Sequence, residues 1–269
     1  GGYGKRLGKI SLNTPKPLIK VKNLTIIEYI VKNLSRFGIN KILLLCHYKH
    51  NLFRKKFHNK IYYGVKIKCI EEKYLMGSSG ALYNAKNNLE KNFLLCNGDT
   101  FFDINISDLI FEFFKKKKLA QIALKRSISK KRYDTFGLKK QGNIIEDVNK
   151  KYNLINSGIY ILSKKIVPYL KKFESLEKKV FKKLIKEKKI FGKEYKNEFL
   201  DMGTYSSLKR LPKFLDKILF KPCLFLDRDG VINKDTGYVF KQKNFKWRKK
   251  IFEFIKKYND KNYYVIIIT

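Results

Sequence analysis

Acidic residues are scarce in this sequence, and arginine is scarcer still. Only 23 Asp and Glu stand against 61 Lys and Arg, and only 8 of those basic residues are Arg. A formal charge of +38 favours an anionic partner, and nucleic acid is one candidate. The lysines are spread along the whole chain with abundant Asn, Ile and Tyr, as a general compositional bias would spread them. We therefore favour solvated lysine faces, whose field would attract phosphorylated substrates, over specific nucleic-acid binding, which stays an alternative.

Long apolar runs and clustered cysteines are lacking too. No apolar run approaches the roughly 18 residues that a membrane helix needs, and the run at residues 265–268 predicts a buried strand. No signal peptide is visible. Cys46, Cys69, Cys96 and Cys223 lie far apart and without the spacing of metal ligands. We expect reduced thiols in a cytoplasmic protein that has no membrane partner.

The pattern of apolar residues alternates between strand-like and helix-like segments. Helical spacing occurs at residues 25–37, 50–58, 81–89, 106–116 and 173–189. Strands are expected at 41–46, 65–70, 92–96, 121–125, 155–162, 223–226 and 264–268, with a hairpin around 137–145. This alternation predicts an α/β fold with a Rossmann-like, mixed but mostly parallel sheet. Ligands of such sheets bind outside the carboxyl ends of the strands.

Phosphate-binding features gather at the start of the chain. Gly1, Gly2 and Gly4 lack side chains, so their backbone N–H groups can approach an anion closely. Arg6 offers a planar fork to phosphate oxygens, and Lys16 stands between two prolines that stiffen its segment. The alternative is a flexible terminus that happens to contain glycines.

Two carboxylates are expected at loop ends. Asp99 follows the strand 92–96 directly, and Asp201 precedes a Gly-Thr turn and a helix start. A hard cation such as Mg²⁺ suits such carboxylates, although Asn-Gly and Gly-Asp are also ordinary turn dipeptides. Gly158 interrupts the strand 155–162, as glycines do where a ligand or another backbone approaches.

In this order the motifs resemble those of the sugar-1-phosphate nucleotidyltransferases, most of all the heptose- and mannose-1-phosphate guanylyltransferases. The resemblance covers residues 1–213. Its motifs are Gly-Gly-x-Gly-x-Arg-Leu at 1–7, Pro-Lys-Pro-Leu at 15–18, Gly-Ser-Ser-Gly-Ala at 77–81, Asn-Gly-Asp at 97–99, Asn-Ser-Gly-Ile-Tyr at 156–160, Ser-Leu-Glu at 175–177 and Asp-Met-Gly-Thr at 201–204. Each motif is weak alone, and seven in the right order are specific together.

The resemblance implies a role for each matching residue. It implies that Arg6 and Lys16 take part in catalysis. It also implies that Asp99 and Asp201 bind Mg²⁺. The nucleoside triphosphate, with GTP favoured, would be held by Gly1, Gly2 and Gly4. The other implied substrate-binding residues are Gly80 near the nucleoside, Asn156 and Gly158 near the sugar, Lys150, and Glu177. The family often has Glu-Lys where this chain has Asn149-Lys150, which leaves the identity of the sugar open.

A second catalytic motif begins near residue 222. Asp227 and Asp229 follow a buried strand two residues apart, a pattern typical of phosphoryl transfer, with an Asp-Gly turn as the alternative. The run 227–239 resembles haloacid-dehalogenase-type phosphatases, in particular the heptose-1,7-bisphosphate 7-phosphatase and histidinol-phosphatase group. The resemblance implies that Asp227 is the nucleophile, that Asp229 is the general acid/base, that both serve Mg²⁺, and that Thr269 binds the phosphoryl group of a sugar bisphosphate.

These observations predict a bifunctional enzyme of nucleotide-activated heptose synthesis. We expect a nucleotidyltransferase domain at 1–213, a linker at 214–221 and the N-terminal part of a phosphatase domain at 222–269. We also expect both ends to be cut, so that a buried strand before the glycines and the later phosphatase motifs are missing. A homo-oligomer is possible. A regulatory module that has lost catalysis is the other alternative.

Overall fold

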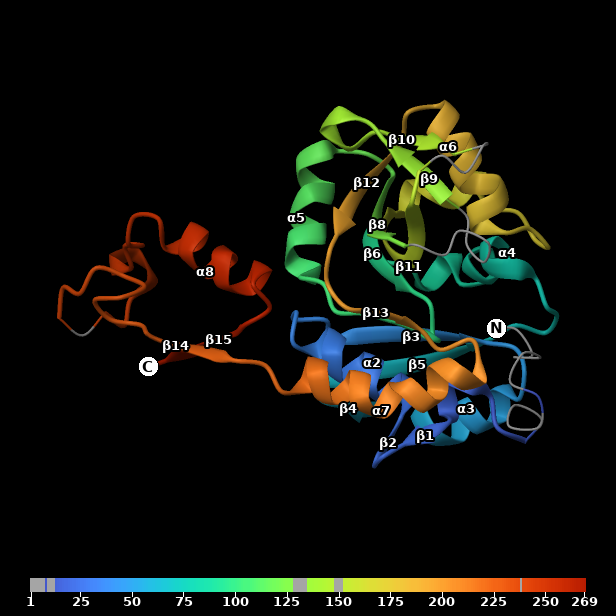
Figure 1. Ribbon diagram of the computed structural model, residues 1–269, viewed down its shortest axis with the longest axis horizontal. Coiled ribbons are helices and arrows are strands. Elements are labelled where there is room, and N and C mark those ends of the chain that lie inside the picture. Colours follow the sequence, from blue (N-terminus) through green and yellow to red (C-terminus); the bar gives the residue numbers. More distant parts are fainter. Residues whose placement is uncertain (1–7, 9–12, 128–134, 148–151, 238) are drawn as a thin grey trace. The chain divides into compact units, whose positions relative to one another are not determined.

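A computed structural model describes residues 8, 13–127, 135–147, 152–237 and 239–269. The chain divides into two compact units, Gly1–Pro212 and Lys213–Thr269 (Figure 1). No helix in the described residues is long and apolar enough to cross a membrane.

A six-stranded sheet forms the centre of the first unit. Its strands are β10 (Ile144–Glu146), β9 (Thr135–Leu138), β11 (Leu154–Ser163), β8 (Ala120–Arg126) and β12 (Ile190–Tyr195), in that order, with β6 (Asn92–Cys96) also paired to β11. β11 is ten residues long, so it pairs with β9 near one end and with β6 near the other. In Figure 1, α5 (Ile106–Lys116) lies on one side of this sheet, and α4 (Gly77–Asn84) and α6 (Lys182–Lys186) lie on the other.

Smaller sheets and short helices complete the first unit. The strands are β1 (Lys20–Val21) with β2 (Leu24–Thr25), β3 (Lys41–Cys46) with β5 (Val65–Glu71) and β4 (Lys60–Tyr62), and β7 (Thr100–Phe102) with β13 (Phe199–Asp201). The remaining helices are α2 (Ile26–Ser35), α3 (His50–Phe57), the 3₁₀ turns η2 (Lys16–Leu18), η3 (Lys86–Asn88), η4 (Lys140–Gly142) and η5 (Lys164–Tyr169), and the π-helix η6 (Leu176–Phe181).

The direction of the strands corrects the expected sheet. Among the described strand pairs of the first unit only β3–β5 and β8–β12 are parallel, so the prediction of a mostly parallel sheet is wrong. Alternating strands and helices indicate the element types, whereas direction depends on which strands become neighbours. Here β11 runs antiparallel to β6, β8 and β9. The fold is a mixed α/β fold.

The largest core described lies between the sheet and the helices α4, η6 and α6. It includes Leu82 of α4, Ile122 of β8, Leu162 of β11 and Phe181 of η6, each at most 2% exposed. Ala120, Ile122 and Leu124 of β8 belong to this core, and the residues between them, Gln121 and Ala123, are buried as well, so both faces of the strand are covered. The core therefore holds α4 and η6 against the same sheet.

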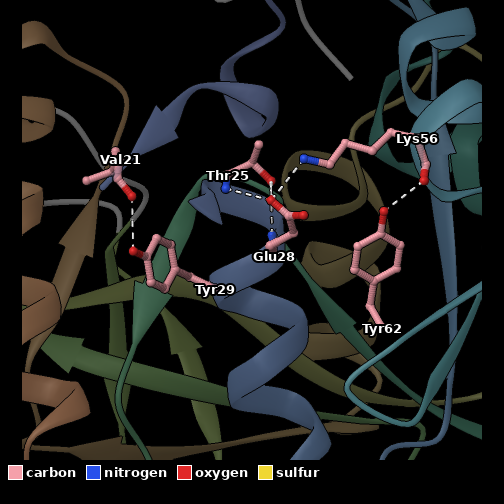
Figure 2. Close-up of polar contacts among 6 residues, drawn as sticks. All are labelled: Val21, Thr25, Glu28, Tyr29, Lys56 and Tyr62. Carbon is pink, nitrogen blue, oxygen red and sulfur yellow. Dashed lines mark hydrogen bonds and ion pairs between the residues drawn. The ribbon is translucent and has the colours of Figure 1, made fainter. Parts of the chain in front are cut away.

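Helix α2 begins with a capping box that also receives a lysine. Thr25 accepts from the Glu28 backbone N–H, and the Glu28 carboxylate accepts from the backbone N–H and the hydroxyl of Thr25 at 2.7 and 2.6 Å. Lys56 of α3 donates to the same carboxylate at 3.0 Å (Figure 2). The first turn of α2 is thus joined to α3 through a carboxylate that is almost fully buried.

The second unit contains a small parallel sheet. β14 (Cys223–Asp227) pairs with β15 (Tyr264–Ile268), and η7 (Gln242–Asn244) and α8 (Ile251–Asp260) lie between them in sequence. Helix α7 (Tyr205–Leu219) continues through most of the expected linker at 214–221. Leu226, Ile232 and Ile251 form the apolar core of this unit.

Candidate active site

Two carboxylates predicted to bind a metal lie on neighbouring strand ends. Asp99 follows β6, and the next strand, β7, pairs with β13 so that Thr100 is opposite Asp201. The Met202 backbone N–H then donates to the Asp99 carbonyl at 2.9 Å. The short antiparallel ladder β7–β13 therefore brings together two segments that are about a hundred residues apart in the sequence. The Asp201 carboxylate also accepts from the Gly203 N–H at 2.8 Å, which closes the turn after β13.

Lys16 reaches this pair from the Pro-Lys-Pro segment. Pro15 precedes η2, and its carbonyl accepts from the Leu18 N–H at 2.8 Å, so the segment is a tight turn. The Lys16 ammonium contacts the Asp99 carboxylate. The Lys16 side chain is 10% exposed and that of Asp99 is 34% exposed, so the ion pair lies partly inside the protein. The Lys16 cation thus pairs with the carboxylate that the sequence predicts to bind a metal.

The glycine in β11 belongs to the same region. Gly158 has φ +78°, and a Cβ there would overlap the side-chain amide of Asn97. The Asn97 backbone N–H donates to the Gly158 carbonyl at 2.9 Å, and the Asn156 side chain accepts from the Gly158 N–H at 2.9 Å. The β8–β11 register shifts between Asn156 and Tyr160, so the glycine bends the strand toward the loop 97–99. Asn97 was not among the predicted site residues, although it begins the Asn-Gly-Asp motif.

A cavity of about 1010 Å³ opens beside these residues. Lys16, Asn97, Asp99 and Gly203 contribute to its lining, and the strands β3 and β6 line it along their length. In the described residues β3 pairs only with β5, and β6 only with β11, so each strand has an edge without a described partner. The expectation of a further strand next to these two stays a prediction.

The Gly77–Gly80 segment packs against the turn that precedes η6. A Cβ on Gly80 would lie 3.2 Å from the Phe173 backbone nitrogen, so the glycine permits the two backbones to meet. Glu177, predicted to bind substrate, has its carboxylate in contact with side chains of the protein. Ser78 and Ser175 each donate to one oxygen at 2.8 Å, and the Tyr160 hydroxyl lies 3.5 Å from the other. Ser78 and Tyr160 were not predicted as site residues, although both belong to recognised motifs.

Five predicted residues lie outside the described part of the chain. They are Gly1, Gly2, Gly4, Arg6 and Lys150. Their predicted roles in substrate binding and catalysis stay predictions.

The donor set fits a magnesium ion better than a soft metal. Asp99 and Asp201 supply oxygen ligands, and no group of three or more His, Cys, Asp and Glu suited to a metal occurs in the described residues. Mg²⁺ in phosphoryl-transfer sites commonly takes one or two protein carboxylates and completes its shell with substrate phosphates and water. Asp99 and Asp201 are therefore of the residue type that suits Mg²⁺, and their role as its ligands stays a prediction.

In the second unit, the predicted phosphatase residues Asp227 and Thr269 lie at the carboxyl ends of two neighbouring parallel strands, and Asp229 follows two residues after Asp227. Asp227 pairs with Ile268 in the parallel ladder, and the Arg228 N–H donates to the Ile268 carbonyl at 3.0 Å, immediately before Thr269. The Arg228 guanidinium donates twice to the Asp229 carboxylate, at 3.1 and 2.7 Å. These hydrogen bonds, with one from Asn233, lower the pKa of Asp229. Nothing in the sequence motif had indicated this Arg228 contact.

Known proteins match most of the chain. The nucleotidyl transferase family matches residues 1–217. A D-glycero-alpha-D-manno-heptose 1-phosphate guanylyltransferase of Campylobacter jejuni is 33% identical over 210 residues, which are 76% of this chain and 91% of the relative. An enzyme of the same name from Aneurinibacillus thermoaerophilus is 29% identical over 221 residues, 80% of this chain and 95% of the relative.

The fold matches as well. The crystal structure of HddC from Yersinia pseudotuberculosis has a TM-score of 0.69 at 25% identity, over 80% of this chain and 96% of that one. The family match ends at residue 217, so the phosphatase resemblance of the second unit rests on its sequence motif alone. By its motifs, its mixed α/β fold and the extent of the match, the chain belongs to the nucleotidyl transferase family.

Proposed function

We propose that the first unit transfers a nucleotidyl group from a nucleoside triphosphate to a sugar-1-phosphate. A phosphate oxygen of the sugar attacks the α-phosphorus, the bond from that phosphorus to the β-phosphate oxygen breaks, and pyrophosphate leaves. A heptose-1-phosphate and GTP are the favoured substrates, because two relatives that share most of the first unit carry the name of a heptose 1-phosphate guanylyltransferase. The observation that carries the proposal is the Lys16–Asp99 ion pair next to the β7–β13 ladder, in which Asp201 lies opposite Thr100.

Each of these side chains has a task that the reaction requires. Asp99 and Asp201 would hold Mg²⁺, which supplies positive charge to the phosphates when it is bound. The Lys16 ammonium offsets negative charge on the phosphate oxygens as the transferring group passes between its two partners. Gly80 would lie near the nucleoside, and Asn156 and Gly158 near the sugar. No protein nucleophile is needed, so catalysis consists of positioning and charge stabilisation.

The test is a pyrophosphate-release assay of the full-length protein with four nucleoside triphosphates and a panel of sugar-1-phosphates. We expect turnover with one sugar above the rest, and a fall of at least about a hundredfold in kcat for Asp99→Asn, the loss typical of a group that stabilises transition-state charge. Glu90→Gln is the matched control, because Glu90 also pairs with a lysine, Lys41, but on an exposed surface. Full activity of Asp99→Asn would exclude the metal assignment, and no turnover with any pair would favour the regulatory module.

We also propose that the second unit is part of a haloacid-dehalogenase-type phosphatase that removes phosphate from a sugar bisphosphate. The supporting observation is the parallel β14–β15 ladder, in which Asp227 ends one strand and Thr269 follows the end of its neighbour. The Asp227 carboxylate would attack the phosphorus atom, and the bond between that phosphorus and the sugar oxygen would break. Water would then hydrolyse the resulting aspartyl-phosphate. Asp229 would transfer protons, with both carboxylates serving Mg²⁺. In the full-length protein, Asp227→Asn should abolish phosphate release and leave pyrophosphate release unchanged; loss of neither would overturn this proposal.

A further inference from the structure

Backbone contacts dock the start of α4 on the turn at residues 171–176. The Ser79 N–H donates to the Glu174 carbonyl at 3.1 Å, and the Ser79 hydroxyl, fully buried, accepts from the Lys171 N–H at 2.9 Å. Gly77 has φ +71°, and a Cβ there would overlap the Glu174 carbonyl oxygen. These contacts fix the start of α4 on the turn, so the position of the Gly77–Gly80 segment depends on the position of the 171–176 turn.

Glu177 is the side chain that joins the two segments. The Ser78 hydroxyl donates to its carboxylate at 2.8 Å and accepts from the Leu176 N–H at 2.8 Å. Ser175 donates to the same carboxylate oxygen at 2.8 Å. Ser78 belongs to α4, whereas Ser175 and Leu176 belong to the start of η6. The Glu177 carboxylate and the Ser78 hydroxyl therefore link the two elements, and we call these hydrogen bonds the latch. Hydrogen bonds to a charged acceptor are stronger than those between neutral groups.

The third contact ties the latch to the sheet. Tyr160 of β11 is 1% exposed, and its hydroxyl faces Glu177 at 3.5 Å. Burial, together with the nearby Glu177 charge, raises the pKa of Tyr160 well above its ordinary value, so the hydroxyl keeps its proton. η6 itself is a π-helix, a rare form that is found mostly as single turns near functional sites.

We infer that Glu177 is a positioning residue: through Ser78 it holds the Gly77–Gly80 segment where the nucleotide binds, rather than contacting the sugar itself. The inference rests on the proposed function, in which Gly80 lies near the nucleoside. Breaking the latch should loosen the nucleotide side of the site, while Lys16, Asp99 and Asp201 stay in place. The effect should therefore fall on the binding of the nucleotide and not on the chemical step.

The test compares Glu177→Gln, Ser78→Ala and the double variant in steady-state assays of the full-length protein. We expect each single variant to raise KM for the nucleoside triphosphate about tenfold, the factor corresponding to one hydrogen bond to a charged group, with kcat and the KM for the sugar phosphate within about twofold. The double variant should be no worse than the worse single one, because both remove the same latch. Ser78→Thr, which keeps the hydroxyl, should restore most of the affinity.

Tyr169→Phe is the matched control. Tyr169 donates to Glu187 at 2.7 Å in another tyrosine–glutamate contact of the same unit, one that does not include the 77–80 segment. The Tyr169→Phe variant should leave the KM for the nucleoside triphosphate and the KM for the sugar phosphate unchanged. A rise in the sugar phosphate KM for Glu177→Gln alone would make Glu177 a direct sugar ligand and overturn the inference, as would unchanged kinetics in both single variants.

Hydrogen exchange separates this inference from the proposed function. If the wild-type protein turns over no substrate pair, the proposed function fails, and the latch is judged by the exchange of the α4 amides at 81–84. Glu177→Gln and Ser78→Ala should both speed that exchange relative to Tyr169→Phe. Equal exchange in all three variants would show that no latch holds the segment.

Discussion

The ammonium of Lys16 contacts the carboxylate of Asp99, 83 residues further along the chain. Pro15 and Pro17 stiffen the turn that carries the lysine, and the β7–β13 ladder sets the position of the aspartate. In the proposed function a metal ion would bind the carboxylate oxygens that Lys16 contacts, so the lysine and the metal would compete for Asp99. Metal binding would then free the lysine to reach a phosphate.

Removal of the lysine charge should separate these two effects. In Lys16→Met we expect kcat to fall at least about tenfold, because a charge that offsets the phosphates is lost. The half-saturating Mg²⁺ concentration should fall as well, because Asp99 has lost its internal competitor. The measurement is a Mg²⁺ titration of pyrophosphate release. Lys41→Met, which breaks the exposed Lys41–Glu90 pair, is the control. An unchanged or higher Mg²⁺ requirement in Lys16→Met would contradict the competition.

Gly158 should tolerate no side chain. Gly158→Ala must adopt φ +78° and must also displace the Asn97 amide, so we expect a loss of about 3 kcal/mol in the free energy of unfolding. Gly64→Ala is the control, because Gly64 has φ +75° with open space around its Cβ position and should lose only about 1 kcal/mol. Urea denaturation measures both. An equal loss in the free energy of unfolding for the two variants would mean that overlap with Asn97 adds nothing to the cost of Gly158→Ala.

Glu28 should make the first unit sensitive to acid. Burial alone would raise the pKa of Glu28, but hydrogen bonds from Thr25 and the charge of Lys56 outweigh it and leave the pKa below its usual value of 4.5. A carboxyl group with a lowered folded pKa contributes stability above its unfolded pKa and loses it as the pH falls through the folded value. We therefore expect Glu28→Gln to lower the free energy of unfolding by about 2 kcal/mol at pH 7 and by much less at pH 3.

The measurement is urea denaturation at both pH values. Lys56→Met should reproduce only part of the effect, because the two Thr25 contacts remain. A difference between wild type and Glu28→Gln that is the same at pH 3 and pH 7 would show that the charge of Glu28 does not stabilise the fold.

The cavity between β3 and β6 should accept a strand. Each of these strands has an edge without a described partner. Most of the surface that lines the cavity is apolar. We propose that an apolar, β-branched segment of about six residues joined before Gly1 would pair with both edges. It should raise Tm by several degrees and slow hydrogen exchange in β3 and β6. A Gly-Ser segment of equal length is the control, and equal Tm values for the two extensions would contradict the proposal.

Element types and limits followed closely from the sequence where one physical signal dominated. The bounds of β3, β6, α5 and β15 agree with the predicted ones, because continuous apolar runs or strong helical spacing define them. The position of Asp99 just beyond the end of β6 was predicted for the same reason, and its role in metal binding stays a prediction. The prediction of a mostly parallel sheet failed, because strand direction depends on neighbours that a local pattern does not contain.

The sequence by itself predicted which residues would carry the chemistry of the proposed function: the glycine-rich start, the aspartates at 99 and 201, and the glycine of β11. Only the tertiary structure decided that Lys16 contacts Asp99, that Gly158 packs on Asn97, and that the Glu177 carboxylate is engaged by Ser78 and Ser175. A motif specifies residue types at fixed local spacing. The contacts Lys16–Asp99, Gly158–Asn97 and Glu177–Ser78 join residues that are 83, 61 and 99 positions apart. They depend on sheet pairing and on the packing of helices against the sheet, which no local pattern encodes.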